Sequence, residues 1–346
     1  MTGPEAGVID LHTHGMPQRL PAFGRRFAGS WPELVATGPC TADIMLGARH
    51  FRSITDQCWN LERRVADMDA DGVARQVISP IPITFAYGLD SDGVAELSRV
   101  QNDWIAEAVR ASPARFSGLG TVPLQDPDRA AEMVVEIRRD LGLAGVEIGS
   151  NVRDVNLDDR ALDPFFAACA EQRALVFVHP WQVLGAGRLT HYGLAESIGM
   201  GAETATAAAT LVMGGVLDRH PNLDVLLAHG GGAFLALLPR IERFWANLSG
   251  AAGCVDRPSS YARRFFYDSL VFDPDAVAAL IGRVGADRVA VGTDYPFAIA
   301  ERPAGAALRG AGLPEAITAA VSTHTAERLL GLTRAGPDPS VKSLRH

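Results

Sequence analysis

Residues 8–14, with the sequence VIDLHTH, decide the fold of this chain, because a short apolar run ends there in two histidines separated by one residue. The run 7–11 has the length of a buried parallel strand. In a continuing strand, side chains i and i+2 point to the same side, so His12 and His14 can converge on one metal ion. One such pair is weak evidence alone, and the rest of the chain must supply further strands and ligands.

Seven more apolar runs of similar length follow, with helix-compatible segments between them. The segments 126–141 and 162–173, for example, carry apolar residues at mixed three- and four-residue spacing, as amphipathic helices do. Eight alternating strands and helices predict an α/β fold of the (β/α)₈ TIM-barrel type, in preference to an open doubly wound sheet. The eight expected strands are 7–11, 74–79, 116–121, 145–148, 174–178, 223–228, 265–268 and 289–292.

Two connections are longer than a barrel needs. The first, after strand 1 at about 17–64, contains Pro, Gly and aromatic residues, and the second, after strand 5 at about 181–202, contains several glycines. We expect both insertions to cover the same mouth of the barrel. The barrel with its insertions is expected to span residues 1–333, and the tail 334–346 has too little apolar content to join its core.

The composition excludes several classes of protein. Of 346 residues, 47% are hydrophobic and 21% charged, which is typical of a folded globular chain. Lys and Arg total 32 against 40 Asp and Glu, and this acidic balance argues against nucleic-acid or anionic-membrane partners and favours a small molecule. The four scattered cysteines indicate reduced thiols. Neither a secretory signal nor an apolar run approaching roughly 20 residues is evident, so we expect a cytoplasmic protein.

Further ligand-type residues follow other expected strands. His179 follows the fifth, His229 the sixth and Asp294 the eighth. Because the carboxyl ends of barrel strands meet at one mouth, these side chains are expected to lie together. Three imidazoles, one carboxylate and a water favour Zn²⁺, while Mn²⁺ or Fe²⁺ stays open. The expected ligands of a single divalent ion are His12, His14, His179 and Asp294.

These motifs resemble the amidohydrolase superfamily (amidohydrolase family 2) and, within it, the branch typified by 2-amino-3-carboxymuconate 6-semialdehyde decarboxylase. The His-x-His pair and the strand-eight Asp are typical of the superfamily, and the resemblance runs almost to Leu332. It implies a distorted (β/α)₈ barrel. Two-metal members carry a bridging Lys at the end of strand four, where this chain has Glu147, so a mononuclear site is expected. The motifs typical of the branch are HPW at 179–181, AHGGGAF at 228–234 and GTDYPF at 292–297.

The resemblance also implies roles for single residues. We expect Asp294 to take part in catalysis as well as ligation, and the resemblance assigns His229 to activating a metal-bound water rather than holding the metal. It assigns Arg52 to a substrate carboxylate and Arg240 to a carboxylate in the neighbouring subunit's site, so a homodimer with shared sites is expected. The expected substrate-binding residues are Phe51, Arg52, Trp181, Glu196, Arg240 and Phe297.

The second insertion departs from that branch. Where its typical member has Tyr-Trp-Leu-Pro-Trp, this chain reads Tyr-Gly-Leu-Ala-Glu at 192–196. A mouth that loses two tryptophans and gains the carboxylate of Glu196 offers less stacking surface and more negative charge. We expect the metal chemistry to be retained and the substrate to differ.

The favoured function is a metal-dependent decarboxylase (a non-oxidative carboxy-lyase) of a small unsaturated or aromatic acid, such as an aminocarboxymuconate semialdehyde-like compound. The alternative is a hydrolase or hydratase of a related carbonyl, imine, lactone or amide, because the same metal hydroxide can attack an electrophilic carbon. A metal-binding sensor or scaffold without catalysis is a third class. The presence of His229 beside the expected ligands argues against it.

Overall fold

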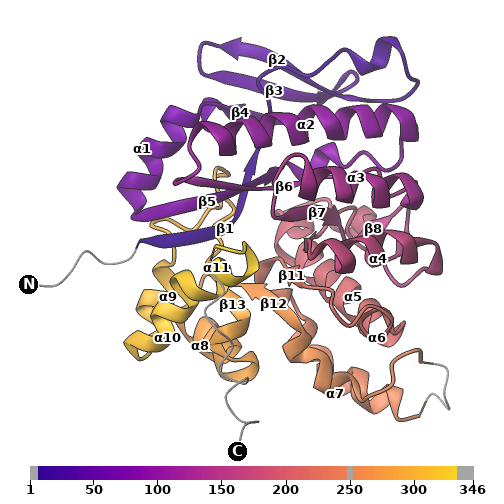
Figure 1. Cartoon of the computed structure of the whole chain (residues 1–346), viewed down its shortest axis with the longest axis vertical. Coiled ribbons are helices and arrows are strands. Elements are labelled where there is room, and N and C mark those ends of the chain that lie inside the picture. Colours follow the sequence, from indigo (N-terminus) through magenta and orange to yellow (C-terminus); the bar gives the residue numbers. More distant parts are fainter. Residues whose placement is uncertain (1–6, 248–251, 333–346) are drawn as a thin grey trace, which may run out of the picture.

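Eight parallel strands, surrounded by helices, form the centre of the computed structural model, which describes residues 7–247 and 252–332 (Figure 1). The strands are β1 (Val8–Gly15), β5 (Val73–Pro80), β6 (Phe116–Gly120), β7 (Gly145–Gly149), β10 (Leu175–His179), β11 (Val225–Leu227), β12 (Phe265–Asp268) and β13 (Val289–Ala290). Each of these strands pairs in parallel with the one that follows it along the chain, which confirms the predicted TIM-barrel-like α/β fold.

The first strand is longer than the sequence predicts, and it closes the barrel irregularly. It continues through both histidines because Thr13 and His14 keep pairing with β5, after a register shift that begins at Asp10. The closing bonds to the segment after β13 run from Leu11 N to Val291 O (2.8 Å) and from His14 N to the carbonyl of Tyr295 (2.7 Å). This irregular closure distorts the barrel at the point where two metal-ligand candidates lie.

Helices cover the outside of the barrel. The predicted segments 126–141 and 162–173 form α3 and α4. Helix α3 begins with Asp126, whose side chain accepts a hydrogen bond from Arg129 N, followed by a proline in the first turn, where the missing N–H is not needed. The helices are α1 (Leu61–Asp71), α2 (Ser91–Ala111), α3 (Pro127–Arg139), α4 (Asp163–Gln172), α5 (Met200–Met213), α6 (Val216–Arg219), α7 (Phe234–Trp245), α8 (Pro274–Val284), α9 (Ala306–Gly310), α10 (Glu315–Ala319) and α11 (Thr325–Leu329).

An apolar cluster inside the barrel forms a floor below the expected site. It includes Leu11 of β1, Phe177 of β10 and Phe266 of β12, all buried, and Ala326 of α11 packs against it. The ring of Phe177 lies 4.8 Å from the ring of His12, measured between centroids. The histidines therefore stand on a closed apolar layer that keeps water from reaching them from below.

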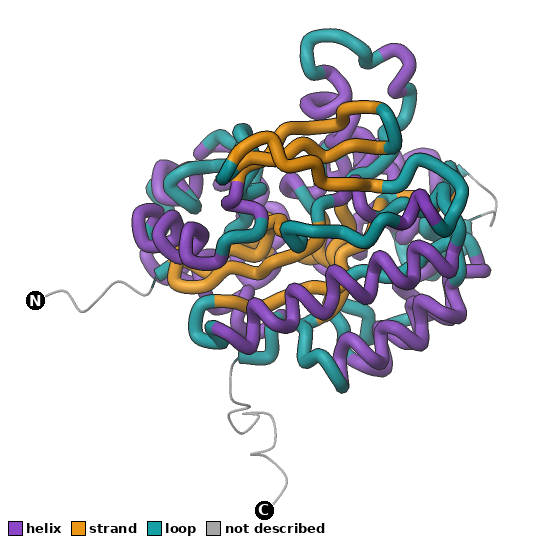
Figure 2. Tube along the Cα trace, turned by 90° about the horizontal axis from the view of Figure 1, so that it is seen from above, coloured by secondary structure: helices purple, strands orange, loops and turns teal. Residues whose placement is uncertain are grey.

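The first insertion contains a small sheet that the sequence did not predict. Strands β2 (Pro32–Gly38), β3 (Thr41–Leu46) and β4 (Arg49–Thr55) pair antiparallel and lie side by side (Figure 2). The second insertion includes a π-helical turn, Ala195–Gly199, that leads into α5. A short hairpin of β8 (Asn151–Val152) and β9 (Val155–Asn156) follows β7.

The expected tail at 334–346 lies outside the described residues. All four cysteines are free. Among the helices of the described part of the chain, none is both long and apolar enough to cross a membrane.

Candidate metal centre and substrate cavity

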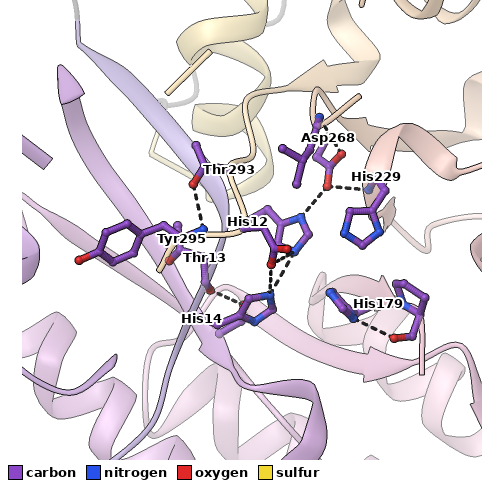
Figure 3. Close-up of polar contacts among 12 residues, drawn as sticks. His12, Thr13, His14, His179, His229, Asp268, Thr293 and Tyr295 are labelled. Atoms are coloured by element: carbon purple, nitrogen blue, oxygen red, sulfur yellow. Dashed lines mark hydrogen bonds and ion pairs between the residues drawn. The ribbon is translucent and has the colours of Figure 1, made fainter. Parts of the chain in front are cut away.

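The four residues expected to bind metal come together at one point. Figure 3 shows His12, His14 and His179 around it. One potential ligand atom from each lies within 4.8 Å of the others, and all four residues are buried. The Nε2 atoms of His12 and His14 are 3.1 Å apart, and His14 Nε2 lies 3.1 Å from Asp294 Oδ1. These side chains come from the ends of β1 and β10 and from the turn after β13. The barrel has thus gathered strand ends that are distant in sequence.

The hydrogen bonds behind the imidazoles determine which nitrogen can bind metal. His12 Nδ1 faces Asp268 Oδ2 (2.7 Å), His14 Nδ1 faces the carbonyl of Pro80 (2.9 Å), and His179 Nδ1 faces the carbonyl of Pro180 (3.0 Å). Carbonyl and carboxylate oxygens only accept, so Nδ1 donates in each neutral ring and Nε2 keeps its lone pair. Two lone pairs 3.1 Å apart, as on His12 and His14, repel each other unless a cation lies between them.

The electrostatics fit the same ion. Burial alone would raise the pKa of Asp294, but the nearby imidazoles of His14 and His12 lower it below its usual range. Burial, with the neighbouring histidines, lowers the pKa of His179 well below its usual value, which keeps this ring neutral. Asp294 Oδ1 is buried without a hydrogen-bond partner among the described residues. A carboxylate with a free oxygen and three imidazoles that each keep Nε2 for a metal form a suitable donor set for one divalent ion.

His229 lies next to this group, but it is not among the four residues whose ligand atoms all lie within 4.8 Å of one another. Its ring centroid is 5.3 Å from those of His12 and His179, and it begins the tight turn after β11 with a φ of +55°. Burial, together with His12, lowers its pKa, so the ring is neutral near pH 7. Its Nδ1 is buried with no partner in the described residues, whereas the residue lines a cavity above the metal centre. The accessible nitrogen is therefore Nε2.

This cavity has a volume of about 610 Å³, and two of the four ligand candidates, His179 and Asp294, line it together with His229. The guanidinium of Arg52, on β4, lies 4.6 Å from the ring centre of Phe297 and 5.6 Å from that of Phe51. Cation–π contacts of this kind hold the charge at the wall of an otherwise mostly apolar chamber. Of the six residues expected to bind substrate, the cavity brings together Phe51, Arg52, Trp181, Glu196 and Phe297.

Arg240 lies elsewhere. It is exposed on α7, its guanidinium stacks over Phe244 at 5.1 Å, and within the described residues it does not line the cavity. Leu237 and Phe244 of the same helix are 45% and 57% exposed. The chain therefore does not deliver Arg240 to its own metal centre.

Three buried charged residues behind the site carry no prediction from the sequence. Asp268 ends β12 and contacts His12, and Asp10 accepts hydrogen bonds from the same histidine's backbone N (3.2 Å) and from a threonine hydroxyl. Arg64 donates to the carbonyl of His14 (2.7 Å). Asp268 could have been found, because it is an acidic residue at a strand end like Asp294. The other two give no such signal, since charged residues in these positions are usually solvated.

Glu147 is a fourth buried charged group near the ligands. It lies at the end of β7, with Oε1 3.7 Å from His14 Nδ1, and burial raises its pKa to about 8. The end of β7 thus carries a Glu in place of the Lys that could bridge two ions.

Comparisons with known proteins agree with this geometry. The amidohydrolase family model matches residues 9–332. The chain is 38% identical over 296 residues to a 2-amino-3-carboxymuconate-6-semialdehyde decarboxylase of Dictyostelium discoideum, covering 85% of this chain and 82% of that protein. It is 29% identical over 351 residues to a Caenorhabditis elegans protein of the same name, covering 86% and 87%.

Solved structures show the same architecture. A 5-carboxyvanillate decarboxylase from Sphingomonas paucimobilis superposes with a TM-score of 0.82 at 27% identity, covering 95% of this chain and 100% of that one. A dihydroxybenzoic acid decarboxylase from Polaromonas, with bound manganese and the inhibitor 2-nitroresorcinol, gives a TM-score of 0.77 at 24% identity, covering 95% and 98%. At that identity the second likeness shows the fold alone.

Proposed function

The chain belongs to the amidohydrolase family, and from this premise we propose that it is a metal-dependent decarboxylase, a non-oxidative carboxy-lyase of small unsaturated or aromatic acids. An aminocarboxymuconate semialdehyde-like compound is the first substrate class to test. The observation that carries the proposal is the convergence of three imidazoles and Asp294 beneath a cavity that also holds His229 and an arginine.

We propose Zn²⁺ as the resident ion, with Mn²⁺ or Fe²⁺ as alternatives. His12, His14, His179 and Asp294 would hold it. When bound, a divalent ion supplies Lewis-acid polarisation and lowers the pKa of a water molecule at the site.

Residues around the cavity have separate roles in the proposed reaction. Arg52 binds a carboxylate of the substrate, because its planar guanidinium can make two parallel hydrogen bonds to it. Phe51 and Phe297 hold that guanidinium and help to exclude water. Loss of CO₂ breaks one C–C bond and leaves its electron pair on carbon, which must take up a proton. His229 faces the cavity with a neutral ring, so its Nε2 can take up a proton from solvent and deliver it to that carbon, which returns the ring to its neutral form.

We also propose a homodimer in which Arg240 reaches the neighbouring subunit's cavity. Its support is the exposed position of Arg240 on α7 beside the exposed apolar residues Leu237 and Phe244. The cytoplasmic location expected from the sequence stays a prediction.

Hydrolysis or hydration is the competing function, because the same metal chemistry can act on an electrophilic carbon. Mass spectrometry of products from carboxylated muconate semialdehydes, hydroxybenzoates and their amides separates the two. We expect CO₂ and a product that has lost it, formed by the metal-loaded protein and not by His179→Ala. Products that have gained water, with no CO₂ released, would establish the hydrolase or hydratase instead.

A further inference from the structure

Asp268 connects the metal centre to the proposed acid/base group. Its carboxylate is fully buried at the end of β12 and lies between His12 and His229 (Figure 3). Each of its oxygens accepts two hydrogen bonds. Oδ2 accepts from His12 Nδ1 (2.7 Å) and from the backbone N of His229 (2.9 Å). Oδ1 accepts from the backbone N of Gly230 (2.8 Å) and of Leu270 (3.1 Å). One side chain thus contacts both a ligand and the turn that carries His229.

That turn needs support from outside. His229 and the three glycines after it all have positive φ, between +55° and +76°. A Cβ at Gly230 would lie 2.4 Å from Val271 Cγ1, and one at Gly232 would lie 2.1 Å from the carbonyl O of Gly201. The chain is therefore packed tightly into a left-handed path that a side-chain-bearing residue such as His229 rarely adopts. The two hydrogen bonds to Asp268 hold its first two residues there.

We propose that Asp268 is a positioning residue that sets the tautomer of His12 and the place of His229 together. Its oxygen accepts a hydrogen bond from the Nδ1 proton of His12, which leaves Nε2 free for the metal. The same oxygen holds the backbone of His229 beside that metal. The part that concerns His229 rests on the function proposed above, whereas the part that concerns metal affinity depends only on the geometry.

Counting donors shows why an amide cannot replace this carboxylate. Four N–H groups point at Asp268, and three of them belong to the backbone and cannot stop donating. In Asp268→Asn, an NH₂ at the Oδ1 position would face two backbone N–H groups, those of Gly230 and Leu270. An NH₂ at the Oδ2 position would face only the N–H of His229, provided that His12 moves its ring proton to Nε2. That second arrangement removes the lone pair that binds metal.

Asp10 offers a matched control. It is also a fully buried carboxylate beside His12, but it accepts from the backbone N of His12 and from Thr293 Oγ1 (2.6 Å). In Asp10→Asn the amide oxygen can still accept from the backbone N, and the NH₂ can donate to the hydroxyl, which has a free lone pair. This variant replaces a buried carboxylate at a similar depth without changing the tautomer of His12.

The test compares the two variants with the parent by chelator competition for Zn²⁺ and by ¹⁵N NMR of the histidine rings in metal-free protein. We expect Asp268→Asn to lose about 10- to 100-fold in metal affinity, the usual effect of losing a hydrogen-bond partner behind a metal-binding histidine. His12 should carry its proton on Nδ1 in the parent and on Nε2 in this variant. Asp10→Asn should stay within about threefold of the parent in affinity and keep the parent tautomer.

Three outcomes would overturn the proposal. The first is parent-like affinity and tautomer in Asp268→Asn, and the second is an equal loss in both variants, which would indicate a general effect of buried charge. The third is an Nε2–H tautomer of His12 in the metal-free parent, a measurement that needs no variant to fold. Because no substrate is involved, a failed decarboxylase assay would refute the proposed reaction and leave this result unaffected.

Discussion

His229 lies close to the four ligand candidates, but it differs from the three ligand histidines in the hydrogen bonding of its Nδ1 atom. The Nδ1 atoms of His12, His14 and His179 each have an acceptor behind them, which directs Nε2 inward. His229 has no such acceptor at Nδ1 within the described part of the chain. An imidazole without a fixed tautomer can give or take a proton at Nε2, which suits an acid/base group better than a ligand.

Replacing His229 by Ala should separate these roles. Metal content is expected to stay near the parent value, because all four ligand candidates remain. Turnover should fall about 10²- to 10⁴-fold, the usual contribution of a positioned acid or base. Elemental analysis and kcat on the same preparation check both statements. If His229→Ala empties the site, His229 is a ligand and the assignment of the four is wrong.

Arg52 should act on substrate recognition. Arg52→Ala removes a charge-assisted hydrogen bond, so kcat/KM is expected to fall about 10- to 100-fold, mainly through KM. Arg52→Lys should recover only part, since an ammonium group cannot reproduce the planar pair of contacts. Arg99→Ala, on the exposed side of α2, is the control and should match the parent in steady-state kinetics. Equal kinetics for Arg52→Ala and the parent would remove Arg52 from the substrate site.

The sequence predicts the ligand set because barrel geometry is simple. Side chains at the carboxyl ends of β1 and β10 and in the turn after β13 meet at one mouth whatever lies between them. The burial of Arg64 follows no such rule, since two of its three acceptors, the carbonyl of His14 and the hydroxyl of Thr13, lie about fifty residues away. A charged residue on an amphipathic helix is normally solvated, and only the folded chain shows that this one is buried.

At the scale of elements, the barrel strands were predictable and the sheet of the first insertion was not. The barrel strands are short and rich in apolar residues, because both their faces are covered. Strand β2 is mostly exposed, and its sequence, PELVATG, shows neither a run of apolar residues nor a clear alternation. Strand β2 is recognised as a strand only by its pairing with β3, which in turn pairs with β4. Strand β4 carries Phe51 and Arg52, which line the cavity.

Gly145 tests how closely two barrel strands approach each other, and Gly282 is the control. A Cβ at Gly145, the first residue of β7, would lie 2.0 Å from the carbonyl O of Leu175 on β10. Gly145→Ala is therefore expected to destabilise the fold by about 1–3 kcal/mol, as overpacking usually does. Gly282, inside α8, faces open space, and Gly282→Ala should stabilise the fold by about 0.5–1 kcal/mol. Urea unfolding measures both, and a neutral Gly145→Ala would contradict this close approach of β7 and β10.

At the scale of the whole molecule, the proposed active site requires two chains. If Arg240 serves the neighbouring cavity, inactive His229→Ala chains mixed with inactive Arg240→Ala chains should regain activity. In each mixed dimer one of the two sites is intact, so random exchange should restore about a quarter of the parent rate. Arg243→Ala, which changes another exposed arginine of α7, is the control, and its chains are expected to be active by themselves. A mixture of His229→Ala and Arg243→Ala chains should therefore be active both before and after the subunits exchange. Verified mixed dimers without recovered activity would place Arg240 outside the partner's site.

The central claim is that one metal ion, held by four strand-end residues, makes this chain a decarboxylase. The most direct measurement is CO₂ release by metal-stripped protein during stepwise addition of Zn²⁺ or Mn²⁺, using the acid that yields most CO₂ in the product panel. We predict no release without metal, a rise in proportion to the metal added, and a plateau at one ion per chain. CO₂ release by the metal-free protein, a plateau at two ions per chain, or full loading without CO₂ from any acid in the panel would contradict the claim.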